Sequence, residues 1–209
     1  MKLYDYKLAP NPRRVRIFLA EKGISLPTVQ IDLRAGEQFA SEFRAINPDC
    51  TVPVLEFDDG THIGEVIAIC TYFELRHPAP PLMGIGSQDQ AIVADWEHRV
   101  ETQGMRAAAD AFRNSAPGLQ GRALPGPDDY DQIPALAERG RARVLRFFET
   151  LDHALATREF VAGNRYTIAD ITALVTVDFA DRVKLSIPDA CSHLRRWHQA
   201  VSARPSAAA

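Results

Sequence analysis

The segment His77-Pro78-Ala79-Pro80-Pro81 divides the sequence into two parts whose apolar residues follow different periodicities. Before it, short alternating runs typical of strands are interspersed with helical patterns. After it, apolar residues recur almost only at helical spacing. Proline has no backbone N–H and cannot continue a helix, so the change of pattern marks a boundary. We predict two domains, an α/β domain at residues 1–80 and an all-α domain at 87–209, and the 209 residues are enough for both.

The first part has the predicted order β-α-β, a short helical stretch, then β-β-α. The expected strands are residues 3–6, 28–33, 52–57 and 61–63, and the expected main helices are 13–22 and 65–75. Gly23 suits the end of the first helix, because glycine adopts the left-handed backbone that follows many helices. Asp58-Asp59-Gly60 is a turn between the last two strands.

The second part is predicted to hold helices at 88–112, 134–156, 168–183 and 192–203. A loop rich in glycine and proline is expected at 114–133, and a frayed tail at 206–209. Thr167-Ile168-Ala169-Asp170 has the spacing of a capping box, in which the first and fourth residues satisfy each other's backbone N–H groups. Asp170 is therefore assigned to folding and not to catalysis.

Composition and charge exclude several function classes. The chain is 46% hydrophobic and 24% charged with a formal net charge of −3, so it lacks the basic excess of a nucleic-acid binder. No apolar run approaches the roughly 20 residues that span a bilayer, and the first residues do not resemble a signal peptide. The cysteines Cys50, Cys70 and Cys191 form no close pair, which argues against a disulfide framework or a metal site. We expect a cytoplasmic protein that binds a small molecule or another copy of itself.

Three segments carry a resemblance to a known family. They are Pro10-Asn11-Pro12-Arg13-Arg14-Val15-Arg16-Ile17, Asn47-Pro48-Asp49-Cys50-Thr51-Val52-Pro53-Val54-Leu55 and Gly163-Asn164-Arg165-Tyr166-Thr167-Ile168-Ala169-Asp170. In order and spacing they resemble cytosolic glutathione transferases, in particular bacterial, zeta-, theta- and nu-like members. The resemblance covers essentially the whole chain. It implies a thioredoxin-like N-terminal domain that binds glutathione, a C-terminal helical bundle that supplies the electrophile site, a homodimer, a role in detoxification, and glutathione as co-substrate without a bound cofactor.

Such an enzyme must hold the glutathione thiol as its thiolate. Relatives that use serine or cysteine carry it at the position of Ala9, which neither donates nor attacks. Asn11 matches an asparagine of some bacterial relatives. Its oxygen is expected to cap the first helix, with Pro12 at the first helical position, while its NH₂ donates to the sulfur; capping alone is the alternative. Other relatives donate from a tyrosine of the first strand, but that position falls on Asp5 here, so Tyr4 and Tyr6 are expected to pack and Tyr6 is only the fallback donor.

The resemblance assigns the rest of glutathione to further positions. Ala9 and Pro10 lie beside the thiol, and a cis Val52–Pro53 bond presents the backbone of Val52 to the cysteinyl part. Glu65 is expected to bind the γ-glutamyl ammonium, and Val66 its carboxylate through the backbone only, because relatives usually have serine there. Gln38 is matched to the glycine end. Arg13 and Arg34 are further candidates for binding the glycine carboxylate, but exposure to solvent is the expectation for both.

The electrophile pocket is expected at Met105, Arg106 and Phe112, with core packing as the alternative for each. Arg106 in such a pocket would favour an anionic or polar electrophile. The leading function is addition of the glutathione thiolate to a small electrophile. The alternatives are glutathione-dependent reduction of disulfides or peroxides, and a non-catalytic ligand-binding protein on the same fold, which Ala9 and Val66 keep open.

Overall fold

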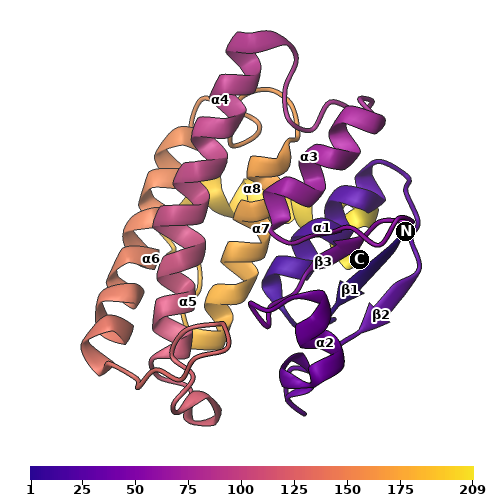
Figure 1. Cartoon of the computed structure of the whole chain (residues 1–209). Helices are drawn as coiled ribbons and strands as arrows, with labels where there is room; N and C mark the ends of the chain where they lie inside the picture. The colour runs from indigo at the N-terminus through magenta and orange to yellow at the C-terminus, as the bar shows by residue number, and fades with distance from the viewer.

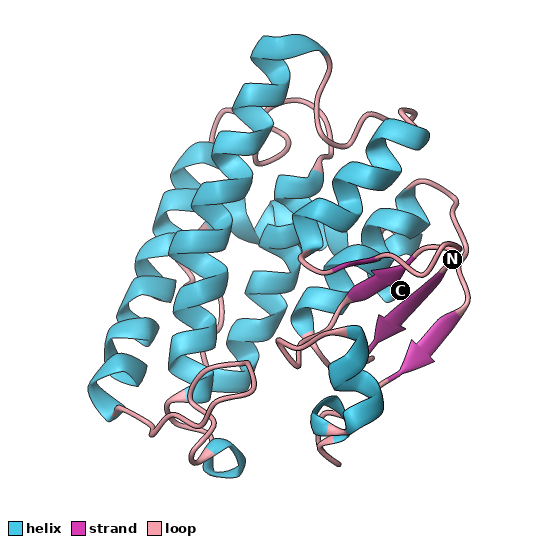
Figure 2. Cartoon of the chain, viewed as in Figure 1, coloured by secondary structure: helices cyan, strands magenta, loops and turns pink.

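The strands of the first domain form one mixed four-stranded sheet with the order β2-β1-β3-β4. In the computed structural model, which describes residues 1–209, the strands are β1 Lys2–Asp5, β2 Thr28–Gln30, β3 Val54–Glu56 and β4 His62–Ile63. β1 pairs in parallel with β2 and antiparallel with β3, and β3 pairs antiparallel with β4. Figure 2 shows that the strands lie on one side of the molecule and that the other side is entirely helical.

The sheet carries helices on both faces, as the alternation of β1 predicts. Leu3 packs into the main core with α1 (Pro10–Glu21) and α3 (Val66–Arg76), whereas Tyr4 joins a smaller cluster with Phe43 of α2 (Ser41–Ile46). A 3₁₀ turn, Glu37–Phe39, precedes α2. The predicted β-α-β, helix, β-β-α order is confirmed. β2 is shorter than predicted, because the Asp32 carboxylate accepts the N–H of Arg34 at 2.8 Å and turns the chain.

The second domain is a helical bundle, as predicted (Figure 1). Its helices are α4 Gly86–Arg99, α5 Arg106–Arg113, α6 Pro134–Leu155, α7 Ile168–Ala180 and α8 Ser192–Ser202. Between α4 and α5 the chain forms a π-helix, Val100–Met105, so the predicted helix 88–112 is continuous but locally widened. None of these helices is long and apolar enough to cross a lipid bilayer.

The predicted capping box begins α7, the central helix of the bundle, whose side chains are almost all buried. The carboxylate of Asp170 accepts the backbone N–H of Thr167 at 3.0 Å and its hydroxyl at 3.1 Å. The same carboxylate accepts the N–H of Val161 at 2.8 Å and the indole N–H of Trp197 at 2.9 Å. The assignment of Asp170 to folding is therefore confirmed.

The expectation of a frayed tail is wrong. Residues Pro205–Ala208 form a 3₁₀ turn that packs on α1, and Ser206 is buried. Arg204 donates twice to the carboxylate of Glu21, which also accepts the Ser206 hydroxyl, and Arg13 donates to the carbonyl of Ala207 at 3.1 Å. These polar contacts to α1 order a tail whose composition alone predicts disorder.

Candidate active site

Three segments assigned to glutathione converge at one edge of the sheet. The register pairs Tyr4 with Val54, so its continuation places Val52 beside Tyr6, just before α1. It also pairs Leu55 with Ile63, so its continuation places Glu65 beside Pro53, at the start of α3. The Val52–Pro53 peptide bond is cis, as predicted. The start of α1, the cis-proline segment and the start of α3 therefore lie together.

Helix α1 begins three residues earlier than predicted. Ala9 is the N-cap, Pro10 is the first helical residue, and no side chain caps the helix. The capping prediction for Asn11 is wrong, because Pro10 already has the fixed backbone angle that suits the first helical position. The N–H of Ala9 donates to the carbonyl of Tyr6 at 2.9 Å, and Pro10 and Pro12 have no N–H. The first turn therefore leaves one free main-chain donor, the N–H of Asn11.

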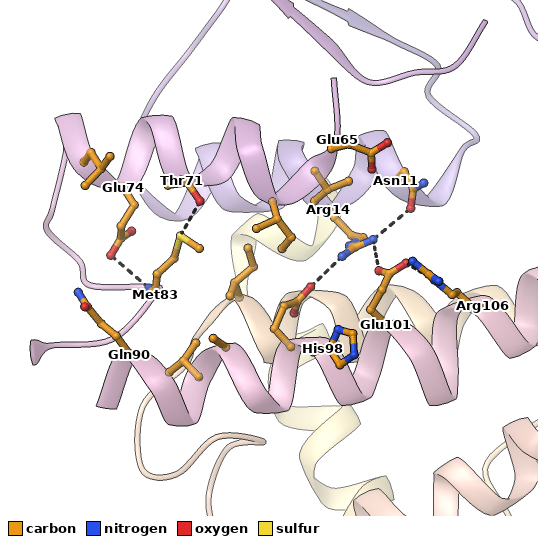
Figure 3. A pocket seen from close by; sticks show the side chains of 17 residues that line it. Asn11, Arg14, Glu65, Thr71, Glu74, Met83, Gln90, His98, Glu101 and Arg106 are labelled. Atoms are coloured by element: carbon orange, nitrogen blue, oxygen red, sulfur yellow. Dashed lines mark hydrogen bonds and ion pairs between the residues drawn. The ribbon is translucent and has the colours of Figure 1, made fainter. Parts of the chain in front are cut away.

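The side chain of Asn11 is oriented by Arg14, one turn further along α1. The Oδ1 of Asn11 accepts a hydrogen bond from Nη1 of Arg14 at 3.1 Å (Figure 3). Because an arginine only donates, this bond assigns the oxygen of the amide to Arg14 and leaves the NH₂ group free. Asn11 is exposed, so both its amide group and its main-chain N–H are available to an incoming ligand.

Arg14 is itself buried in a polar network that joins the two domains. Its Nη2 donates to Glu97 of α4 at 2.8 Å, its Nε donates to the hydroxyl of Thr172 of α7 at 3.1 Å, and its Nη1 lies 2.7 Å from a carboxylate oxygen of Glu101. Thr172 also donates to Glu97 at 2.8 Å. Burial raises the pKa of the Glu97 carboxyl. The network fixes the guanidinium that holds Asn11.

A cavity of about 590 Å³ opens between α3 and α4 beside this network. Figure 3 shows Asn11, Glu65, Glu101 and Arg106 at one end of it. The opposite end is lined by Thr71 and Glu74 of α3, by Met83, and by Gln90 of α4. The end next to the start of α1 is thus strongly polar.

The predicted site residues fall into two groups with respect to this cavity. Asn11, Glu65, Val66 and Arg106 line it, and the remaining residues do not. Those outside it are Tyr6, Ala9, Pro10, Gln38, Val52, Pro53, Met105 and Phe112. Within this second group, Tyr6 packs on the small cluster that contains Val52, and Gln38 is buried in the 3₁₀ turn before α2.

Two of the residues expected to line the electrophile pocket pack elsewhere. Met105, the last residue of the π-helix, is a core residue, 4% exposed. Phe112 packs edge-to-face on Phe179 of α7, with ring centroids 5.4 Å apart. Arg106 alone of the three borders the cavity, with its Nε 3.8 Å from Glu101.

The sequence reasoning missed Arg14, Glu97, Glu101 and His98, all of which border the cavity. One signal was available: at helical spacing Arg14 falls on the same face as the apolar Ile17 and Phe18. An arginine on an apolar face requires a buried partner. Helical spacing does not identify that partner, because the partner comes from another helix and is brought near only by the tertiary fold.

Comparisons with known proteins agree with this architecture. The family model for the N-terminal domain of glutathione S-transferase matches residues 9–76, and that for the C-terminal domain matches residues 122–205. Glutathione S-transferase 2 of Saccharomyces cerevisiae is 36% identical over 209 residues, covering 99% of this chain and 87% of the yeast protein.

Solved structures give the same result. A glutathione S-transferase domain-containing protein from Marinobacter aquaeolei VT8 is 39% identical, with a TM-score of 0.91 over 99% of both chains. A class Gtt2 glutathione S-transferase from Vibrio parahaemolyticus is 33% identical, with a TM-score of 0.84 over 99% of this chain and 95% of that one. The chain therefore belongs to the glutathione S-transferase family.

Proposed function

We propose that this glutathione transferase adds the thiolate of glutathione to a small electrophile and that Asn11 stabilises the thiolate. The observation that carries the proposal is the orientation of Asn11, whose oxygen is held by Arg14 so that its NH₂ group is free. Asn11 also presents the one free main-chain N–H of the first turn of α1. Two donors of one residue are thus available to a single sulfur atom.

The physical basis of this role is the pKa of the thiol. A free thiol has a pKa of about 8.5, and hydrogen-bond donors and the positive end of a helix lower it by favouring the thiolate. Ala9 offers no hydroxyl or thiol for this purpose. Lowering of the pKa therefore depends on Asn11 and on the start of α1, with Tyr6 as the fallback donor.

The remaining contacts of glutathione follow from the convergence of the three segments. The backbone of Val52, in the cis bond to Pro53, pairs with the cysteinyl part, beside Ala9 and Pro10. The exposed carboxylate of Glu65 binds the γ-glutamyl ammonium, and the N–H of Val66, the first residue of α3, binds its carboxylate. Gln38 contacts the glycine end.

The electrophile approaches the thiolate beside Arg106, whose side chain is 69% exposed at the rim of the cavity. Glu101 compensates this guanidinium only partly, because their closest atoms are 3.8 Å apart. A cationic donor that is only partly compensated, next to the reacting sulfur, favours an electrophile with an anionic or polar group.

We also propose that the protein is a homodimer. Large apolar side chains are exposed on the two elements that border the cavity: Ile67 (38%) and Leu75 (78%) of α3, Ile92 (40%) of α4, and Ile85 (60%), its N-cap. A symmetric homodimer, in which this surface packs on the same surface of a second copy, would bury these side chains. Analytical ultracentrifugation should give twice the mass of the chain, and Leu75→Glu should shift the protein toward the monomer.

The substitution Asn11→Asp tests the role of Asn11, because it keeps the shape of the side chain but removes the NH₂ donor and adds a negative charge. The pKa of bound glutathione, followed by the ultraviolet absorbance of its thiolate, should rise by on the order of one unit, and kcat/KM should fall about tenfold. The matched control is Asn164→Asp, the same chemical change in an exposed loop. An unchanged thiol titration would remove Asn11 from the mechanism.

Calorimetry with glutathione, followed by turnover of a panel of electrophiles and of a disulfide, tests the reaction itself. The transferase predicts binding of glutathione and turnover of at least one electrophile. Turnover of the disulfide alone would support the reductase alternative, and binding without any turnover would support a non-catalytic protein. Absence of glutathione binding would contradict all three.

A further inference from the structure

The π-helix between α4 and α5 brings two oppositely charged side chains onto one face. Residues of an α-helix share a face when they are three or four positions apart, whereas Glu101 and Arg106 are five apart. In the π-helix Val100–Met105 the hydrogen bonds span five residues, and the N–H of Arg106 donates to the carbonyl of Glu101. The wide turn therefore places Arg106 over Glu101, and Figure 3 shows both side chains at the same end of the cavity.

The wide turn is supported from the other side by α6. The guanidinium of Arg143 donates to the carbonyl of Thr102, in the middle of the π-helix, at 2.5 Å. Gly104 packs so closely on Phe147 that a Cβ atom at this position would lie 2.6 Å from the ring. The π-helix thus has a hydrogen bond and a close packing contact of its own, both independent of the charged pair on its opposite side.

The carboxylate of Glu101 faces two arginines with its two oxygen atoms. Its Oε2 lies 2.7 Å from Nη1 of Arg14, and its Oε1 lies 3.8 Å from Nε of Arg106. The two arginines differ in exposure, because the side chain of Arg14 is 3% exposed and that of Arg106 is 69% exposed. One carboxylate therefore belongs both to the buried network that orients Asn11 and to the rim at which the electrophile is expected.

The other carboxylates at this end of the cavity have different partners. Glu97 is buried and accepts a hydrogen bond from Arg14, and Glu65 is assigned to the ammonium of glutathione. Glu101, whose side chain is 27% exposed, is therefore the acid that a ligand beside Arg106 meets. An anionic group at this place is attracted by the guanidinium and is at the same time repelled by the carboxylate.

We propose that Glu101 determines how strongly the electrophile site prefers anionic electrophiles to neutral ones. Glu101 partly neutralises Arg106, so an anionic electrophile must compete with a carboxylate that is already in place. A neutral electrophile depends on neither charge. The inference rests on the proposed function, in which the electrophile reacts beside Arg106. It makes Glu101 a specificity-determining residue that acts through Arg106 and does not itself hold the substrate.

A pair of aryl chlorides tests the proposal: chlorodinitrobenzene, which is neutral, and chlorodinitrobenzoate, which adds a carboxylate to the same ring. In both reactions the glutathione sulfur forms a bond to the ring carbon, and chloride leaves with its bonding electron pair. The quantity to measure is the ratio of kcat/KM for the anionic electrophile to kcat/KM for the neutral one. A change in the ionisation of the thiol affects both reactions alike, so it cancels in this ratio.

Glu101→Gln should raise this ratio about fivefold, the scale of one partly exposed ion pair, because Arg106 loses its counter-charge. Arg106→Gln should lower the ratio by a similar factor. In the double variant the effect of Glu101→Gln should be smaller, since no cation draws the anion to this place. The matched control is Asp95→Asn, which removes an exposed carboxylate of α4 that pairs with Arg99, and it should leave the ratio unchanged.

Three results would overturn the inference. If Glu101→Gln changes both reactions equally, Glu101 acts only through Arg14 and the thiolate. If its effect on the ratio is undiminished without Arg106, the two residues are not partners. Glu101→Asp keeps the charge and should stay closer to the wild-type ratio than Glu101→Gln does, so equal ratios for these two variants would also contradict a role of charge. Thermal unfolding of each variant checks that it is folded.

Binding of the two reaction products, measured by calorimetry, separates this inference from the proposed function. Each product is glutathione with the aryl group on its sulfur, so the comparison needs no turnover. Glu101→Gln should strengthen binding of the anionic product relative to the neutral one. That result without turnover by the wild type would overturn the transferase and leave the charge preference, whereas turnover with an unchanged preference overturns the role of Glu101 alone. Binding of neither product overturns both.

Discussion

Burial of the Arg14 guanidinium is energetically acceptable because each of its three nitrogen atoms has a polar partner. Its partners Glu97 and Thr172 are buried too, and Glu101 completes the set. Removal of one member of such a pair leaves the other charge in a medium of low polarity, and this costs more than the pair contributes. The same bonds orient Asn11, so stability and chemistry depend on one side chain.

We predict that Arg14→Met lowers the free energy of unfolding by about 3–5 kcal/mol, because the Glu97 carboxylate loses its partner. Adding Glu97→Met should recover a large part of that loss, since the double variant retains only the carboxylate of Glu101, whose side chain is 27% exposed. Urea denaturation of the two single variants, of the double variant and of Arg146→Met as the exposed control measures the difference. A double variant that loses the sum of the two single effects would show that the charges are not paired.

Among single residues, the sequence predicts Asn11 as a helix cap, and this prediction is wrong. The cap prediction treated Asn11 as the start of the helix, and Pro10 takes that place instead. The partner of Arg14, Glu97, is 83 positions away, so no local pattern names it.

The bounds of helices with a strong apolar periodicity were predictable from the sequence. The irregular turns inside or between such helices were not. The helices α6 and α8 agree with the expected ranges within one residue. The π-helix at Val100–Met105 carries one extra residue in a turn, and periodicity over a long window averages this out. Met105, the last residue of this π-helix, packs in the core, which is the alternative that the sequence left open for it.

The capping box of α7 predicts a pH dependence. Burial raises the pKa of Asp170 to about 6, so the folded state binds a proton that the unfolded state has already released. The contribution of Asp170 to stability is therefore largest near pH 4 and falls as the pH rises to about 6. Asp170→Asn does not titrate, so its destabilisation relative to wild type should shrink by on the order of 3 kcal/mol from pH 4 to pH 7. Denaturation of both proteins across this range measures it; a constant difference would contradict the shift.

The contact between α5 and α6 depends on Gly140. A Cβ atom on this residue would lie 2.7 Å from the carbonyl oxygen of Ala107 and 2.7 Å from the nitrogen of Ala111, closer than real Cβ atoms approach. Both are backbone atoms, so the helices must separate. Gly140→Ala should cost about 1–3 kcal/mol of unfolding free energy despite the better helix propensity of alanine. Gly118→Ala, where a Cβ meets nothing within 4 Å, is the control and should be close to neutral in thermal unfolding.

In the whole molecule, α1 is the element through which the two domains are held together. Arg14, in its second turn, joins α1 to the buried network, and Glu21, in its last turn, holds the C-terminal tail. The loop after α5 adds a second contact between the domains, because the guanidinium carbon of Arg122 lies 4.0 Å from the centre of the Phe39 ring. The division into two domains was predictable from periodicity, whereas these connections were not, because each joins residues far apart in the sequence.

The tail offers a test at this scale. Deletion of residues 205–209 removes the hydrogen bond from Arg13 to the carbonyl of Ala207 and that from Ser206 to Glu21, and it uncovers the part of α1 on which the 3₁₀ turn packs. The free energy of unfolding should fall by about 1–3 kcal/mol, the effect of a few partly buried hydrogen bonds. Deletion of Ala209 alone, which leaves both bonds in place, is the matched control. Equal stability of the two truncated chains in urea would mean that the tail only rests on α1 and does not hold it.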